Sequence, residues 1–177
     1  HLGGNMLFLY IYGDNLEDKL GHMLFLGFYL ACGALANVAQ VLADPASPIP
    51  VVGASGAIAG VMGGYLLLFP KAKVDILVIF VVFFRVFSIS AWIVLGLWFA
   101  LQLLNGATST AASSGIAYWA HIGGFAAGLV LIFPLFIRLG AAAFWRRTLG
   151  HPPHPEKIYA GSLARVPLVP RKSNTRK

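Results

Sequence analysis

Ser55 and His121 are the two residues of this 177-residue chain whose side chains could carry out covalent chemistry together. A serine hydroxyl is a weak nucleophile until a base accepts its proton, and histidine is the usual base. Ser55 lies near the start of an apolar run, and unpaired N–H groups at a helix N-terminus would stabilise a developing oxyanion. The two residues therefore indicate nucleophilic attack on a carbonyl group, if the fold brings them into contact.

His1 and Asn5 could supply further hydrogen-bond donors to the same oxyanion. They are four positions apart, so they share one face of a helix. No group of Cys, His, Asp and Glu residues has the spacing of metal ligands. We therefore expect no metal and no cofactor.

The composition indicates where this chemistry takes place. Hydrophobic residues make up 58% of the chain and charged residues 11%, whereas soluble domains carry about 25% charged residues. These values exclude a soluble globular protein, a disordered chain and a collagen-like chain. We expect an all-α, polytopic membrane helical bundle.

The apolar runs predict the elements of this bundle. In chain order they are a helix end over 1–12, a polar connector over 13–21, spans over 22–42 and 53–69, an interfacial segment over about 76–90, a span over about 91–105, a flexible loop over 106–117 and a last span over 118–139. Residues 1–139 form the membrane core, and 140–177 a basic tail that we expect to be disordered. The chain opens on His1 inside an apolar run, which indicates a fragment with one more helix upstream.

The basic residues predict the orientation of the bundle. Residues 138–177 hold nine of the thirteen Lys and Arg residues and one acid, Glu156, so the positive-inside rule places the tail in the cytoplasm. Alternation of the spans then makes 43–52 and 106–117 external, and neither loop contains Lys or Arg. Orientation by itself accounts for the charge of the tail, so we expect no nucleic acid as a partner. The lipid bilayer is an expected partner of the chain as a membrane protein.

This topology places Ser55, His121 and the face shared by His1 and Asn5 at similar depth on the external side. Each residue also has a simpler interpretation, since a lone serine in a membrane helix commonly packs or caps and a lone histidine commonly bonds between helices or relays protons. Glycines spaced by four indicate close helix packing without catalysis; they are Gly56, Gly60 and Gly64, and separately Gly124 and Gly128. The residues alone leave an enzyme and a transporter open.

The motifs taken together resemble those of the rhomboid family of intramembrane serine proteases. They occur in the family's order over residues 1–139 and are HxxxN (His1 to Asn5), GxxxExxxG (Gly13, Glu17, Gly21), GxSG (Gly53 to Gly56) and AHxGG (Ala120 to Gly124). The resemblance implies a rhomboid-like core in which five of six helices are present. It also implies a mobile lid over 106–117 and substrate entry beside 76–90 and the helix that follows.

The resemblance assigns a role to each motif residue. Ser55 is the nucleophile and His121 the general base, while the Ser55 backbone N–H, His1 and Asn5 form the oxyanion site. The structural motif residues are Glu17, Gly53, Gly56 and Gly124, and Gly124 allows the last helix to pack against the third. Three features depart from the family: the first helix and its Trp-Arg loop are absent, and Ala59 stands where many members place an aromatic beneath the histidine.

The expected function is an intramembrane serine endopeptidase that cleaves transmembrane helices near the external membrane boundary. Its substrates are single-span membrane proteins with helix-breaking residues, and the expected location is a prokaryotic plasma membrane. The alternative is a catalytically inactive relative that binds transmembrane clients, although such relatives typically lose the serine or the histidine. A transporter is a more distant alternative, because no internal repeat is present. The substrate and the oligomeric state are left open.

Overall fold

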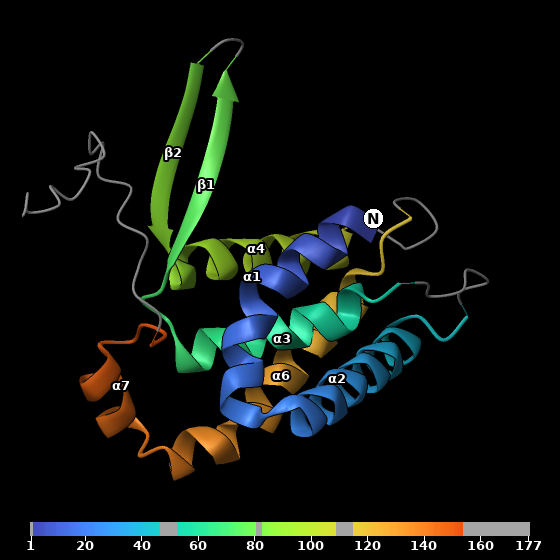
Figure 1. The fold of residues 1–177 in the computed structure, drawn as a ribbon. Coiled ribbons are helices and arrows are strands. Elements are labelled where there is room, and N and C mark those ends of the chain that lie inside the picture. Colours follow the sequence, from blue (N-terminus) through green and yellow to red (C-terminus); the bar gives the residue numbers. More distant parts are fainter. Residues whose placement is uncertain (1, 47–52, 81–82, 109–114, 154–177) are drawn as a thin grey trace, which may run out of the picture.

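A computed structural model describes residues 2–46, 53–80, 83–108 and 115–153 (Figure 1). The described residues form six helices and one two-stranded antiparallel hairpin. The elements are α1 (Leu2–Leu20), α2 (His22–Ala43), α3 (Ser55–Leu68), β1 (Lys73–Phe80), β2 (Phe83–Ser90), α4 (Ala91–Thr108), α6 (Tyr118–Arg138) and α7 (Ala142–Thr148).

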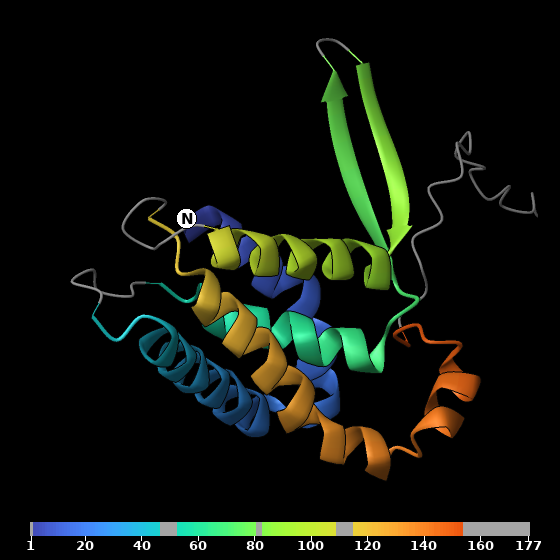
Figure 2. The same ribbon diagram turned by 180° about the vertical axis from the view of Figure 1, so that it is seen from behind.

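The helices form the membrane bundle that the sequence predicts. Within the described residues, α2, α4 and α6 are long and apolar enough to cross a bilayer. The shorter α3 has 14 residues, 11 of them buried, and is about 21 Å long at 1.5 Å per residue. Figures 1 and 2 show it in the middle of the bundle, with the other helices around it. An apolar composition on every face suits α3 to this central position.

The backbones of α3 and α6 touch where they cross. A Cβ atom on Gly124 would overlap the carbonyl oxygen of Gly56, and one on Gly128 would overlap that of Gly60. Only glycine at these positions allows the two helices to approach so closely. The close packing that the four-residue glycine spacing predicts is thus present.

The first helix is longer than predicted. The polar segment expected as a connector over 13–21 is helical as far as Leu20, so α1 continues through it. Tyr12 and Leu16 lie four residues apart and are both buried, so the segment has an apolar face despite its charges. The helix ends at Leu20, and Gly21 follows it with a φ of +77° that favours glycine.

The interfacial segment expected over 76–90 is part of the hairpin of β1 and β2, which adds a small sheet to the helical bundle. Val, Ile and Phe residues dominate both strands, a composition that favours extended structure. Polar pairs from facing positions lie at its base, where Lys73 bonds Ser90 and Ser88 bonds Asp75. The hairpin projects away from the helices, across the direction of α4 (Figures 1 and 2). The predicted boundary before residue 91 coincides with the start of α4.

The start of the tail also differs from the prediction, because α7 is ordered against the C-terminal end of α3. Phe144 is buried, and the Trp145 indole donates a hydrogen bond to the Leu67 carbonyl at 2.9 Å. The backbone N–H of Lys71 donates to the Gly150 carbonyl at 3.0 Å. Disorder over the whole of 140–177 is therefore wrong for its first part, and residues 154–177 lie outside the described residues.

Candidate active site

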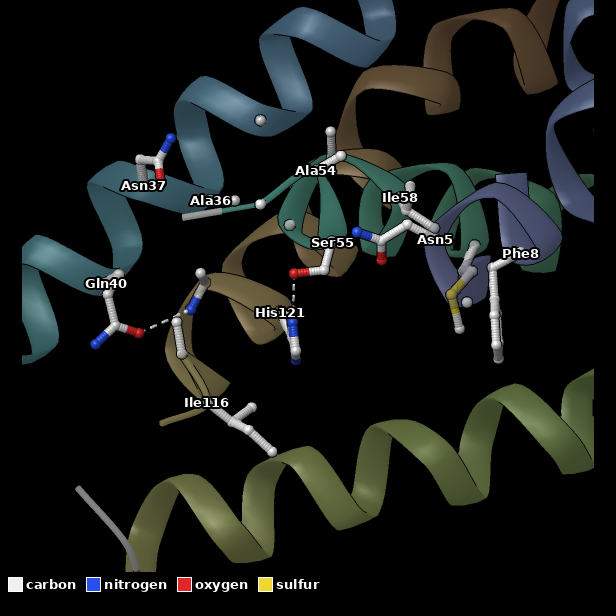
Figure 3. Close-up of a pocket in the computed structure, with 18 of the residues that line it drawn as sticks. Asn5, Phe8, Ala36, Asn37, Gln40, Ala54, Ser55, Ile58, Ile116 and His121 are labelled. Carbon is white, nitrogen blue, oxygen red and sulfur yellow. Dashed lines mark hydrogen bonds between the residues drawn. The ribbon is translucent and has the colours of Figure 1, made fainter. Parts of the chain in front are cut away.

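Ser55 and His121 contact one another directly. Ser55 is the first residue of α3, His121 lies in the first turn of α6, and Ser55 Oγ is 2.9 Å from His121 Nε2 (Figure 3). Both side chains are partly buried. The fold thus brings together the nucleophile and the base that the sequence predicts, at hydrogen-bond distance.

The pair lies at a cavity of about 1130 Å³. Its wall includes residues from α1, α2, α3, α4 and α6, among them Asn5, Gln40 and Trp98. Asn5 is a lining residue, as the sequence predicts, and lies beside the start of α3 in Figure 3. His1 lies outside the described residues. The cavity is large enough for several residues of an extended peptide.

The backbone at the start of α3 can serve as an anion-binding site. Gly53 has a φ of +126°, which brings the chain into the helix in a conformation that side chains rarely adopt. Ser55 and Gly56 occupy the first turn, where N–H groups have no acceptor within the helix. Their N–H groups and the positive end of the helix dipole therefore lie next to the Ser55 hydroxyl.

Gln102 is a site residue that the sequence analysis missed. Its Oε1 lies 2.9 Å from His121 Nδ1, on the ring side opposite Ser55. It is 9% exposed although it belongs to the apolar helix α4. A polar residue at membrane depth was the available signal, but the sequence did not show which group it would meet.

Gln40 is a second missed residue, and it supports the turn that carries His121. Its Oε1 accepts a hydrogen bond from the Ala120 backbone N–H at 3.1 Å, and its side chain is 4% exposed. Figure 3 shows the bond joining α2 to the first turn of α6. Gln40 thereby accepts a hydrogen bond from one of the backbone N–H groups that have no acceptor within the first turn of α6.

An aromatic ring does pack near His121, but α4 supplies it. The ring centroids of Trp98 and His121 are 5.9 Å apart. Ala59, where the resemblance leads us to expect an aromatic, is buried but offers only a methyl group. The aromatic side chain that packs near the His121 ring therefore comes from α4 and not from α3.

Glu17 lies away from this cavity, where α1 meets α2. Its carboxylate contacts Nδ1 of His22, the first residue of α2, and its carbonyl accepts from the Gly21 backbone N–H. These contacts connect the two helices. Glu17 is not among the residues that line the cavity of Ser55 and His121, and its structural role remains a prediction.

Metal chemistry has no evident site in the part of the chain that the structure describes. No group of three or more His, Cys, Asp or Glu residues there could hold a metal ion. The described site offers a hydroxyl, an imidazole, amides and backbone N–H groups.

Comparison with known proteins identifies relatives of this chain. The Rhomboid domain family matches residues 1–138. Over 134 residues the chain is 33% identical to "Rhomboid protein 1, mitochondrial" of Saccharomyces cerevisiae, covering 73% of this chain and 36% of that protein. Over 170 residues it is 31% identical to "RHOMBOID-like protein 4" of Arabidopsis thaliana, covering 96% of this chain and 39% of that protein.

The chain thus spans well under half the length of these two relatives. Both come from eukaryotes, so they lend no support to the prokaryotic origin expected from the sequence. No solved structure matches the chain.

Proposed function

The chain belongs to the rhomboid family of membrane proteins, and on this basis we propose that it is an intramembrane serine endopeptidase in which Ser55 and His121 form the catalytic pair. The observation that carries the proposal is the 2.9 Å contact between Ser55 Oγ and His121 Nε2 at the edge of a cavity. A serine and a histidine in this arrangement need no third acidic residue to exchange a proton.

The proposed reaction proceeds through an acyl-enzyme. Ser55 Oγ attacks the peptide carbonyl carbon while His121 Nε2 accepts the hydroxyl proton. The carbonyl becomes an oxyanion, which the Ser55 backbone N–H and Asn5 stabilise, with His1 as a further donor. His121 then gives its proton to the leaving amine as the C–N bond breaks. Water, deprotonated by His121, attacks the ester and releases the new carboxyl end and the Ser55 hydroxyl.

The proposed substrates are single-span membrane proteins. A peptide bond inside a helix is shielded, because its N–H and C=O groups are hydrogen-bonded along the chain. The substrate must therefore unwind locally before its carbonyl can reach Ser55, and helix-breaking residues lower the free-energy cost of unwinding. This requirement favours cleavage near the external membrane boundary, where the helix end and water are close.

The proposed orientation places the tail in the cytoplasm and the cavity on the external side. Lys71 and Lys73 follow the end of α3 that is opposite to Ser55. Arg146 and Arg147 lie in α7, which packs against the same end of α3. Basic residues flanking a membrane helix favour the cytoplasm.

The proposal is tested with Ser55→Ala and His121→Asn in the full-length protein, reconstituted with a model single-span substrate. We expect both substitutions to abolish cleavage, and a fluorophosphonate probe to label the wild-type protein but neither variant. Persistent cleavage by the Ser55→Ala variant would refute the protease assignment. Substrate binding without any cleavage by the wild-type protein would instead favour the alternative function, a non-catalytic protein that holds transmembrane clients.

A further inference from the structure

Two residues of α4, Trp98 and Gln102, both contact the imidazole of His121. They are four positions apart and therefore share one face of the helix. The Trp98 ring lies 5.9 Å from the imidazole, centroid to centroid, and Gln102 Oε1 lies 2.9 Å from Nδ1. We propose that Trp98 and Gln102 are positioning residues, through which α4 sets the tautomer and the orientation of the catalytic base. This inference rests on the proposed protease function.

The tautomer argument follows from the chemistry of the amide oxygen. Gln102 Oε1 can only accept a hydrogen bond, so the contact requires a proton on His121 Nδ1. A neutral imidazole carries one ring proton, so Nε2 is then left with its lone pair. Nε2 is the atom that faces Ser55 Oγ, and it can take the hydroxyl proton only in this tautomer.

The burial of Gln102 supports a specific role. Its neighbours Leu101 and Leu103 are 46% and 44% exposed, whereas Gln102 is 9% exposed. α4 thus turns its single glutamine toward α6, while the two leucines next to it in the sequence are exposed. Placing an amide in an apolar surrounding is costly unless the group is hydrogen-bonded, and the bond to His121 offsets that cost.

Aromatic contacts hold this face of α4 against α6. The Trp98 ring also lies 6.1 Å from Phe125, one helical turn beyond His121. Phe99 stacks on Phe125 with ring centroids 4.6 Å apart. The histidine ring is therefore enclosed by contacts between α4 and α6, and its alignment depends on the docking of α4.

The Gln102 experiment compares two substitutions in the reconstituted full-length protein. Gln102→Met keeps the size of the side chain and removes the acceptor, while Gln102→Glu retains an acceptor oxygen. We expect Gln102→Met to lower kcat by about 10- to 100-fold with little change in KM, a part of the 10²–10⁴-fold typical of general-base catalysis. We expect Gln102→Glu to keep most of the activity. A Gln102→Met protein with kcat within about twofold of wild type would overturn the inference for Gln102.

The Trp98 experiment uses a second tryptophan of the same helix as its control. Trp92 is 56% exposed and lies near the start of α4, where its backbone N–H donates to the Pro70 carbonyl, beyond the end of α3 that is opposite to Ser55. We expect Trp98→Leu to lower kcat by about 10-fold, and Trp92→Leu to stay within about twofold of wild type. Equal effects of the two substitutions would remove Trp98 from the proposal.

A spectroscopic measurement tests the tautomer without turnover. In protein labelled with ¹⁵N-histidine, the His121 signals, identified by their loss in His121→Asn, should show a protonated Nδ1 and an unprotonated Nε2. Gln102→Met should populate the other tautomer. An unchanged tautomer in Gln102→Met, or a protonated Nε2 in the wild type, would contradict the proposal even if Gln102→Met proved unstable in the activity assay.

The experiments separate failure of this inference from failure of the proposed function. If wild-type protein does not cleave, or Ser55→Ala cleaves equally well, the protease assignment fails, and the ¹⁵N measurement still decides whether Gln102 sets the tautomer. If cleavage depends on Ser55 while Gln102→Met and Trp98→Leu match the wild type, only the positioning role is lost.

Discussion

The backbone of Gly124 lies directly against that of Gly56, so closely that a Cβ atom on Gly124 would overlap the Gly56 carbonyl oxygen. Gly56 follows Ser55, and Gly124 is three residues beyond His121 in the same helix. The contact between the two glycines therefore sets the separation of α3 and α6 close to the point where the side chains of Ser55 and His121 meet. A distance of 2.9 Å between Oγ and Nε2 depends on this approach.

The first prediction concerns Gly124. Gly124→Ala should force α3 and α6 apart, lower cleavage by more than about 10-fold and lower the unfolding temperature. Gly27→Ala in α2 is the matched control, because a Cβ there meets nothing within 4 Å. Activity assays and thermal unfolding of both variants measure the effect. Equal behaviour of the two variants would show that the glycine contact does not set the geometry of the pair.

The second prediction concerns the buried Gln40. Gln40→Leu leaves the Ala120 N–H without its acceptor, and an unsatisfied buried donor costs about 1–3 kcal/mol. We expect a loss of stability of that size, together with reduced cleavage, because His121 follows Ala120. Gln40→Glu keeps an acceptor and should be milder. Denaturant titration compares the stability of the variants. A Gln40→Leu protein as stable as wild type would show that the hydrogen bond from Ala120 to Gln40 does not stabilise the fold.

The third prediction concerns Glu17. Its contact with His22 lies at the surface, with the His22 side chain 91% exposed, and exposed ion pairs contribute little to stability. His22→Ala should therefore leave both cleavage and the unfolding temperature close to wild type. An inactive His22→Ala protein would show that the junction of α1 and α2 influences the distant cavity.

The fourth prediction concerns orientation. Cys32 is fully buried, so the wild-type protein should not react with a membrane-impermeant maleimide. Ala46→Cys and Pro153→Cys introduce thiols at exposed positions before α3 and after α7. On intact cells, Ala46→Cys should be labelled and Pro153→Cys should react only after the membrane is opened. Labelling of Pro153→Cys but not of Ala46→Cys on intact cells would contradict the proposed orientation.

Much of the bundle could be predicted from the sequence because hydropathy is a local property. The spans of α2, α3 and α6, and the start of α4 at Ala91, follow from runs of apolar residues and the residues that end them. The close approach of α3 and α6 follows from glycine spacing, since small residues at every fourth position make one flat helix face. Charge distribution predicts the orientation by an equally local rule.

The sequence by itself also predicted, from motif order and from depth in alternating spans, that Ser55, His121 and Asn5 lie together, and all three line one cavity. Only the tertiary structure decided that α1 continues through the charged segment to Leu20 and that Lys73–Phe80 and Phe83–Ser90 pair as two antiparallel strands. Polar residues are compatible with a helix when its other face packs, and a short apolar run does not distinguish strand from helix. The roles of Gln102, Gln40 and Trp98 were likewise decided by the fold. The partner of a lone polar or aromatic side chain depends on how neighbouring helices are rotated and crossed, and that is a property of the packed bundle.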